Sequence, residues 1–134
     1  MKEVNKMNKT IMVVDEEQRF HDSYTEWLEN SEYEVISVYD GEEALVKLEE
    51  KRPHLIITEI VLSMMTGDTL FLYIKSMPEY EDIPVIMASS FTLRPYKSLK
   101  EVDPNLTFLQ KTYITSQYQK YLKCTLKNIL KKCH

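Results

Sequence analysis

Short apolar runs alternate with amphipathic stretches along the whole chain. Five apolar runs, several of them rich in β-branched residues, are expected to form buried strands at 10–14, 34–39, 54–60, 84–88 and 106–109. After each run, apolar residues recur at helical spacing, as in the stretches beginning near Phe20, Ala44, Leu70, Phe91 and Tyr113. The fourth helical stretch, 91–102, is expected to be the weakest, because Pro95 interrupts it. The pattern therefore predicts five consecutive strand–helix units.

Strands that are apolar on both faces and alternate with helices indicate a parallel sheet covered by helices on both sides. The predicted fold class is α/β, a doubly wound five-stranded parallel sheet. A length of 134 residues fits one domain with one compact core. We therefore predict a single domain over 1–134, in which residues 1–9 form a flexible tail.

Composition narrows the classes of partner. The chain has 17 basic and 21 acidic side chains, a net charge of -4, which argues against direct nucleic-acid binding. No stretch approaches the roughly 20 apolar residues that span a bilayer, and the polar start does not read as a secretory signal. We therefore expect a cytoplasmic protein with no membrane partner. Cys124 and Cys133 are expected to be free thiols, and His134 alone does not make a metal site.

Polar residues lie at or just after the ends of four of the five predicted strands. In a doubly wound sheet, ligands and chemistry collect at the carboxyl ends of the strands. The residues expected at those ends are Asp15 and Glu16, then Glu59, Ser89 and Lys111. Three carboxylates, one hydroxyl and one ammonium group are therefore predicted to converge at one edge of the sheet.

Several sequence blocks, in order, resemble one known family. The blocks are Met12–Glu17, Asp40–Leu45, Leu55–Ile60, Ile83–Met87 and Lys111. They are similar to the receiver domains of response regulators in two-component signalling, and the resemblance runs from about Thr10 to the end of the chain. Ser89 follows Glu59 by 30 positions and Lys111 follows Ser89 by 22, which is similar to the family's spacing. The resemblance implies a flavodoxin-like (βα)5 receiver fold.

The resemblance also implies roles for these residues. In the family, two acidic residues after the first strand hold magnesium, and an aspartate at the end of the third strand takes a phosphoryl group from a histidine kinase. Asp15 and Glu16 match the acidic pair, and Ser89 and Lys111 match the hydroxyl and lysine that bind the phosphoryl oxygens. Phe108 matches the aromatic position whose rotamer reports activation. The acceptor position is occupied by Glu59 instead of aspartate.

Glu59 is the informative departure from the family. Phosphoryl transfer depends on in-line positioning and charge neutralisation, and the longer side chain carries its carboxylate into the space meant for phosphorus. We therefore predict an atypical pseudo-receiver that is not phosphorylated at this position. Two readings stay open: Glu59 acts as a constitutive phosphomimetic near Ser89 and Lys111, or the site is silent and Glu59 is solvated or paired with Lys111.

Magnesium prefers hard oxygen ligands, so Asp15, Glu16 and Glu59 are predicted as its ligands if this chain uses the ion. A second reading has Asp15 capping the first helix, with Gln18 in a capping-box arrangement. The two readings are compatible.

The favoured function is a phosphorylation-independent protein-interaction module without catalytic turnover. Its partner would be a signalling protein or a histidine kinase, and a homodimer is left open. Aromatic and apolar residues near the family's partner surface suit an interface, with some of them expected in the core: Leu93, Tyr96, Leu99, Phe108, Tyr113, Tyr118 and Tyr121. The alternatives are a magnesium-dependent switch phosphorylated at Glu59 or Asp15 and, less favoured, an unrelated flavodoxin-like enzyme or cofactor binder.

Overall fold

The computed structural model describes residues 9–29, 32–111 and 116–131. Its five strands are β1 (Lys9–Val14), β2 (Tyr33–Val38), β3 (Leu55–Thr58), β4 (Val85–Ser89) and β5 (Thr107–Gln110). Its helices are α1 (Gln18–Leu28), α2 (Gly41–Glu50), α3 (Gly67–Ser76), the 3-10 helix η1 (Arg94–Glu101) and α4 (Ser116–Lys131). The predicted alternation of strands and helices is confirmed, with bounds that differ by a few residues.

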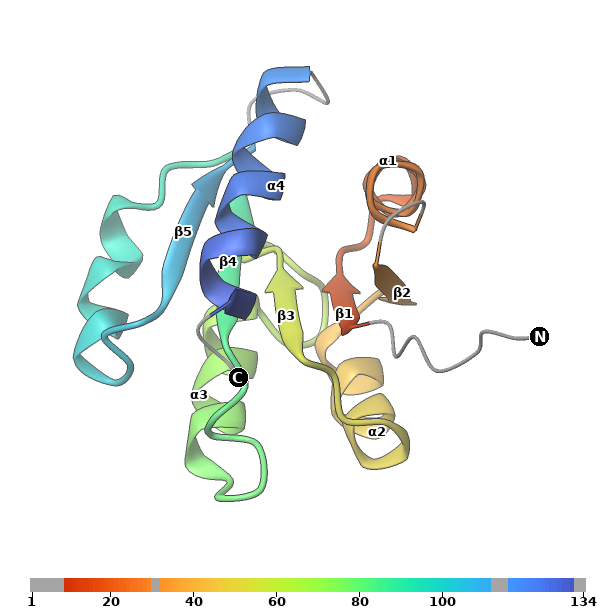
Figure 1. The fold of residues 1–134 in the computed structure, drawn as a ribbon. Coiled ribbons are helices and arrows are strands. Elements are labelled where there is room, and N and C mark those ends of the chain that lie inside the picture. Colours follow the sequence, from red (N-terminus) through yellow and green to blue (C-terminus); the bar gives the residue numbers. More distant parts are fainter. Residues whose placement is uncertain (1–8, 30–31, 112–115, 132–134) are drawn as a thin grey trace.

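The strands form one parallel sheet in the order β2-β1-β3-β4-β5 (Figure 1). In the register of the central strands, Ile11 of β1 pairs with Val35 of β2 on one side and Leu55 of β3 on the other. Strand order reverses on either side of β1, which is the doubly wound topology that the sequence predicts. The predicted fold class is confirmed.

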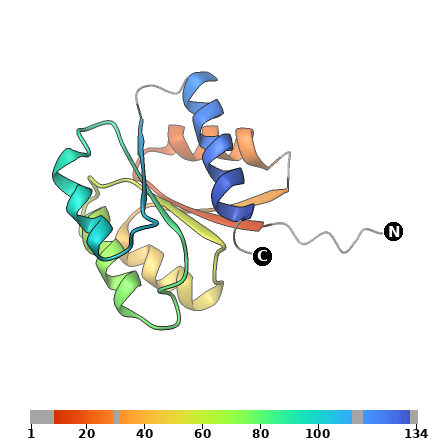
Figure 2. The same cartoon turned by 60° about the vertical axis from the view of Figure 1, so that its left-hand side comes forward.

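Helices cover both faces of the sheet. In Figure 2, α1 and α4 lie on one side of the strands and α2 and α3 on the other. The alternation of side chains along β1 divides the core accordingly. Ile11 and Val13 pack in the cluster that includes α1 and α4, whereas Met12 and Val14 pack in the cluster that includes α2 and α3. A strand buried on both faces therefore needs the unbroken apolar run that the sequence shows.

Two helix starts differ from one another in their capping. Asp40 caps α2, because its side chain accepts a hydrogen bond from the Glu43 amide at 2.8 Å, and Glu43 in turn accepts from the Tyr39 amide. The prediction that Asp15 caps the first helix is wrong. The N-cap residue of α1 is Glu17, and Asp15 lies two residues before it.

Three predicted segments need correction or lie partly outside the described residues. The segment expected as a helix over 91–102 forms only the 3-10 helix η1, which has Pro95 in its first turn and no buried residue. Its apolar residues Leu93, Tyr96 and Leu99 recur every three positions and pack against the core, and this spacing matches the three-residue turn of a 3-10 helix. Lys9 was expected in the tail but is the first residue of β1, and residues 1–8 lie outside the described chain. The predicted start of the last helix at Tyr113 also lies outside it.

A lysine with a largely buried side chain connects the third helix to the two loops that precede β4 and β5. The Lys75 ammonium donates hydrogen bonds to the carbonyls of Glu81 at 2.9 Å and Ile83 at 2.8 Å, and it pairs with Asp103 at 3.0 Å. These contacts hold the outer half of the sheet against α3.

None of the helices in the described part of the chain has the length and apolar character needed to cross a membrane. Cys124 is an exposed free thiol, as predicted, and Cys133 lies outside the described residues.

Candidate acidic pocket

The hydrogen bonding of the sheet positions three of the predicted site residues. Asp15, Glu59 and Lys111 each follow a strand directly, and their amides continue the ladder. The amide of Asp15 bonds the Val38 carbonyl at 3.1 Å, that of Glu59 bonds the Val14 carbonyl at 2.9 Å, and that of Lys111 bonds the Ser89 carbonyl at 2.8 Å. Because β1, β3 and β5 are parallel, the three side chains start from the same edge of the sheet, here called the carboxyl edge.

One ammonium group joins the two buried carboxylates at this edge. Lys111 Nζ lies 2.7 Å from Asp15 Oδ2 and 2.7 Å from Glu59 Oε1. All three residues are buried, and Lys111 is only 1% exposed. The Phe20 ring lies under the ammonium, with its centroid 3.8 Å from Nζ, which adds a cation–π contact on the apolar side. Two carboxylates that would otherwise repel each other are thus held together by a single positive charge.

The remaining oxygens of both carboxylates are also satisfied. Glu59 Oε2 accepts hydrogen bonds from the amides of Ile60 at 2.7 Å and Val61 at 3.0 Å. Asp15 Oδ1 accepts from the Glu17 amide at 2.9 Å. Every carboxylate oxygen of the pair therefore has a described partner, as buried charges require. We call this set of contacts around Glu59 the Glu59 clamp: Lys111 on one oxygen, and the amides of Ile60 and Val61 on the other.

The other predicted site residues are placed less directly. Ser89 is buried, but its hydroxyl accepts a hydrogen bond from the Phe91 amide at 3.1 Å and so serves the loop after β4. Glu16 is exposed, and its carboxylate accepts a hydrogen bond from the Ser63 amide. Phe108 is partly buried and packs against the core cluster on the α2–α3 side. Its role as a switch stays a prediction.

The donor chemistry of Asp15, Glu16 and Glu59 suits magnesium, but their arrangement does not. Among the described residues, no group of three or more His, Cys, Asp or Glu side chains is arranged to hold a metal ion. Lys111 lies between Asp15 and Glu59, and Glu16 bonds the Ser63 amide instead. A divalent ion would have to displace the ammonium from at least one carboxylate. Magnesium binding by these residues stays a prediction.

The loop after β3 is closed by a glycine that packs against the backbone of Glu59. A Cβ atom added to Gly67 would lie 2.1 Å from the Glu59 carbonyl oxygen, so no other residue fits without moving the loop. The Gly67 amide bonds the Ile60 carbonyl at 2.8 Å, and Met64 within the loop has φ of 71°. Thr112, which stands where the family usually has a proline, lies outside the described residues.

Sequence reasoning missed two residues of α1 that support the pocket. The apolar pattern marks Phe20 only as part of a helix face and gives no role to His21. His21 is buried, and its Nε2 donates a hydrogen bond to the Asp15 carbonyl at 2.6 Å, while its ring lies 4.2 Å from that of Tyr39. Its Nδ1 has no partner within the part of the chain that the structure describes. A polar residue between Phe20 and Tyr24 on a buried helix face was the available signal.

A pair of buried tyrosines packs α1 against α4. The hydroxyls of Tyr24 and Tyr118 lie 2.6 Å apart, and the edge of Trp27 packs against both rings. Burial raises the pKa of Tyr24 and of Tyr118, and the charges of Asp15 and Glu59 raise them further. Both hydroxyls are therefore strongly favoured in the protonated form.

The aromatic residues predicted near a partner surface are mostly part of the core. Leu93 and Tyr118 are buried, and Tyr96, Leu99 and Phe108 are partly buried against the core. Tyr121 alone among the described members is well exposed, and Tyr113 lies outside the described residues.

Comparison with known proteins points to one family. The model of the response regulator receiver domain matches residues 11–123. The polar-differentiation response regulator DivK of Brucella anthropi is 32% identical over 88 residues, which are 66% of this chain and 72% of DivK. The alkaline phosphatase synthesis transcriptional regulatory protein PhoP of Bacillus subtilis is 44% identical over 61 residues, which are 46% of this chain. The match spans only 25% of the length of PhoP.

Solved structures agree with this result. The phosphorylated cyanobacterial phytochrome response regulator RcpA superposes with a TM-score of 0.80 and 26% sequence identity, over 90% of this chain and 92% of that one. The family model covers most of the chain. The chain therefore belongs to the response regulator receiver domain family, whose members act in signal transduction.

Proposed function

We propose that this receiver domain signals through protein–protein contacts and is not phosphorylated at Glu59. The observation that carries the proposal is the Glu59 clamp: one carboxylate oxygen is bound by Lys111 and the other by the amides of Ile60 and Val61. An acceptor must present a free carboxylate oxygen in line with the phosphorus. Neither oxygen of Glu59 is free.

Charge supports the same conclusion. A phosphoryl group adds about two negative charges and three acceptor oxygens, which would need partners in the pocket. Lys111 is already shared between Asp15 and Glu59, and the Ser89 hydroxyl is bound to the Phe91 amide. Glu59 thus supplies a permanent negative charge in contact with Lys111. Among the described contacts, Glu59 has no hydrogen bond to Ser89. We infer a domain with one fixed state, in which Glu59 substitutes for only part of a phosphoryl group.

The proposed partner is another signalling protein, a histidine kinase included, and the domain is proposed to have no catalytic turnover. The competing proposal is a magnesium-dependent switch that accepts phosphate at Glu59 or Asp15. Asp15 is no better placed than Glu59 to accept a phosphoryl group, because the two carboxylate oxygens of Asp15 bind Lys111 and the Glu17 amide. Phosphate uptake separates the two proposals.

The deciding experiment is the intact-protein mass after incubation with acetyl phosphate and magnesium. The unaltered protein, Glu59→Asp and Glu59→Gln are compared in parallel. We expect a phosphoryl adduct on Glu59→Asp only, because the shorter side chain leaves room for phosphorus while Ser89 and Lys111 are retained. An adduct on the unaltered protein would overturn the proposal, and the Glu59→Gln and Asp15→Asn variants would then show which carboxylate carries it.

A further inference from the structure

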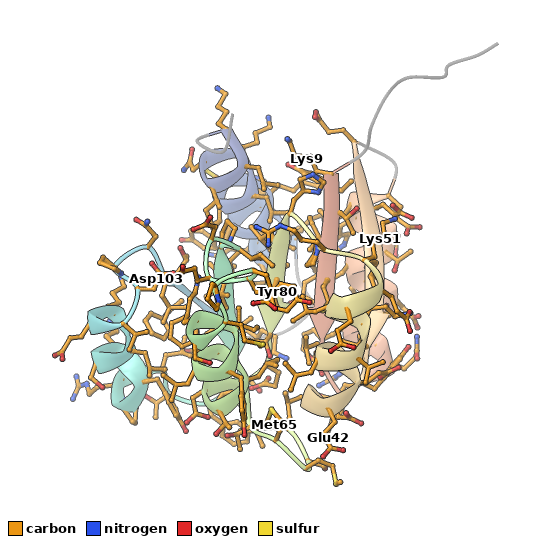
Figure 3. All side chains as sticks on the ribbon, turned by 90° about the horizontal axis from the view of Figure 1, so that it is seen from below. Lys9, Glu42, Lys51, Met65, Tyr80 and Asp103 are labelled. Carbon is orange, nitrogen blue, oxygen red and sulfur yellow. The ribbon has the colours of Figure 1, made fainter. Side chains whose placement is uncertain are left out.

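A basic cavity lies at the opposite edge of the sheet from the acidic pocket. It has a volume of about 530 Å³ and is lined by Lys9, Glu32, Tyr33, Lys123, Lys127, Leu130 and Lys131. Lys9 and Tyr33 begin β1 and β2, and Lys131 ends α4, so the cavity opens at the amino ends of the strands, here called the amino edge. Figure 2 shows the end of α4 close to the beginning of β1, and Figure 3 labels Lys9 at that end of the strand.

The lysines of this cavity are unusual for the chain as a whole. The protein is acidic, with 21 acidic and 17 basic side chains, yet the 16 residues of α4 include four lysines and no acidic residue. Lys123, Lys127 and Lys131 are spaced by four residues and so share one stripe of the helix. Like charges at this spacing disfavour a helix, and only the last turn gains from the helix dipole. Helix stability alone therefore does not account for the stripe.

The positive charges also lack partners. Within the described residues, none of Lys9, Lys123, Lys127 and Lys131 has an ion pair, whereas Lys75 and Lys111 elsewhere in the chain are paired. Among the described residues that line the cavity, Glu32 is the single carboxylate. The positive charge also acts on the neighbouring His54. Burial lowers the pKa of His54, and the charges of Lys9, Arg52 and Lys51 lower it further.

We propose that this cavity binds a small ligand bearing an oligophosphate group. Its volume falls within the range of about 300–1,000 Å³ that small-molecule sites occupy, which suits a compact anion. Lysine ammonium groups on successive turns of α4 would each contact a different phosphate group. Tyr33 and Leu130 provide an apolar wall against which a planar ring can pack, so a nucleoside triphosphate should bind more tightly than bare tripolyphosphate.

The proposal does not depend on whether Glu59 accepts a phosphoryl group, because the two sites lie at opposite edges of the sheet. The test is calorimetric titration of the full chain with ATP, tripolyphosphate and hexaglutamate, without added magnesium. We expect saturable binding of ATP at one site per chain. Weaker binding of tripolyphosphate supports the phosphate site together with the packing of the ring, whereas equal binding would contradict the contribution assigned to Tyr33 and Leu130.

Matched charge variants locate the site. Lys123→Gln combined with Lys127→Gln removes two exposed lining lysines, and Lys97→Gln combined with Lys100→Gln removes two exposed lysines of η1, outside the cavity. The lining pair should weaken ATP binding by about tenfold or more, since two charge-assisted contacts to phosphate oxygens are lost. The control pair should change it by less than about twofold, because distant exposed charges are screened.

Three outcomes would overturn the proposal: no saturable binding of either phosphate compound, equal losses in the two double variants, or tighter binding of hexaglutamate than of ATP. The last result would assign the cavity to an acidic peptide instead. All four substitutions are at exposed positions, and unchanged circular dichroism would show that the fold is retained.

Discussion

The two edges of the sheet treat charge in opposite ways. At the carboxyl edge, Asp15, Glu59 and Lys111 are buried and paired with one another at 2.7 Å. At the amino edge, the lysines of α4 are exposed and have no ion pair among the described residues. The first arrangement satisfies its charges internally, and the second leaves them available to solvent or a ligand. Charge at a strand end is therefore not by itself a sign of a binding site, because what matters is whether the protein already neutralises it.

The first prediction concerns removal of the positive charge at the carboxyl edge. Lys111→Met leaves Asp15 and Glu59 as buried carboxylates without a positive partner, and we expect a loss of about 3–5 kcal/mol in the free energy of unfolding. Urea unfolding measures it. The matched variant Lys127→Met at the amino edge should change stability by no more than about 0.5 kcal/mol. Equal effects of the two substitutions would contradict the contrast between the edges.

The second prediction disturbs the Glu59 clamp without touching a charge. Gly67→Ala places a Cβ atom against the Glu59 backbone, so the loop that carries the Ile60 and Val61 amides must move. Such overpacking typically costs about 1–3 kcal/mol. Gly41→Ala is the natural control, because its Cβ atom would meet the side chain of Met65 rather than the backbone of the site. The idea fails if Gly41→Ala proves the more destabilising in thermal unfolding.

The third prediction concerns alkaline pH. The folded-state pKa values of Tyr24 and Tyr118 are raised, while an unfolded tyrosine ionises near about pH 10. Their contribution to stability is thus complete below about pH 10 and is lost as pH rises above it, because only the unfolded state releases protons there. We expect the melting temperature to fall above that pH, and to fall less steeply in a Tyr24→Phe, Tyr118→Phe double variant. Tyr73→Phe, at an exposed position, should leave the slope unchanged.

The fourth prediction, with the smallest expected effect, uses the ionisation of His54 to detect the positive charge at the amino edge. Its folded-state pKa is lowered from about 6.5, so stability is complete above that pH and declines as pH falls through the window below it. Part of the lowering comes from nearby lysines and Arg52, which salt screens. The acid-side decline should therefore be shallower at about 1 M salt than at low salt, and smaller in His54→Asn. A salt-independent decline would mean that burial alone sets the effect.

The sequence predicts the strands well because β1, β3 and β4 are buried on both faces and their apolar runs have no competing interpretation. It predicts η1 less well, because the spacing of three between Leu93, Tyr96 and Leu99 is compatible with either an α-helix or a 3-10 helix. At the site, the convergence of Asp15, Glu59 and Lys111 follows from parallel topology alone, and the pairing of Glu59 with Lys111 was one of the readings left open.

Contacts that join distant segments could not be read from the sequence. The sharing of Lys111 by Asp15, and the Phe20 ring beneath its ammonium, both depend on how α1 packs against the sheet. The basic cavity needs the end of α4 to close over the beginnings of β1 and β2, and no spacing of lysines along one helix specifies that closure.

The Glu59 clamp also has a genetic consequence. Glutamate and aspartate codons differ only in the third base, so a single nucleotide change converts position 59 into the residue that the family uses as acceptor. Under the proposed function, a clamped domain and a phosphorylatable one are thus adjacent in sequence space. Mutation alone would cross between them readily, in either direction.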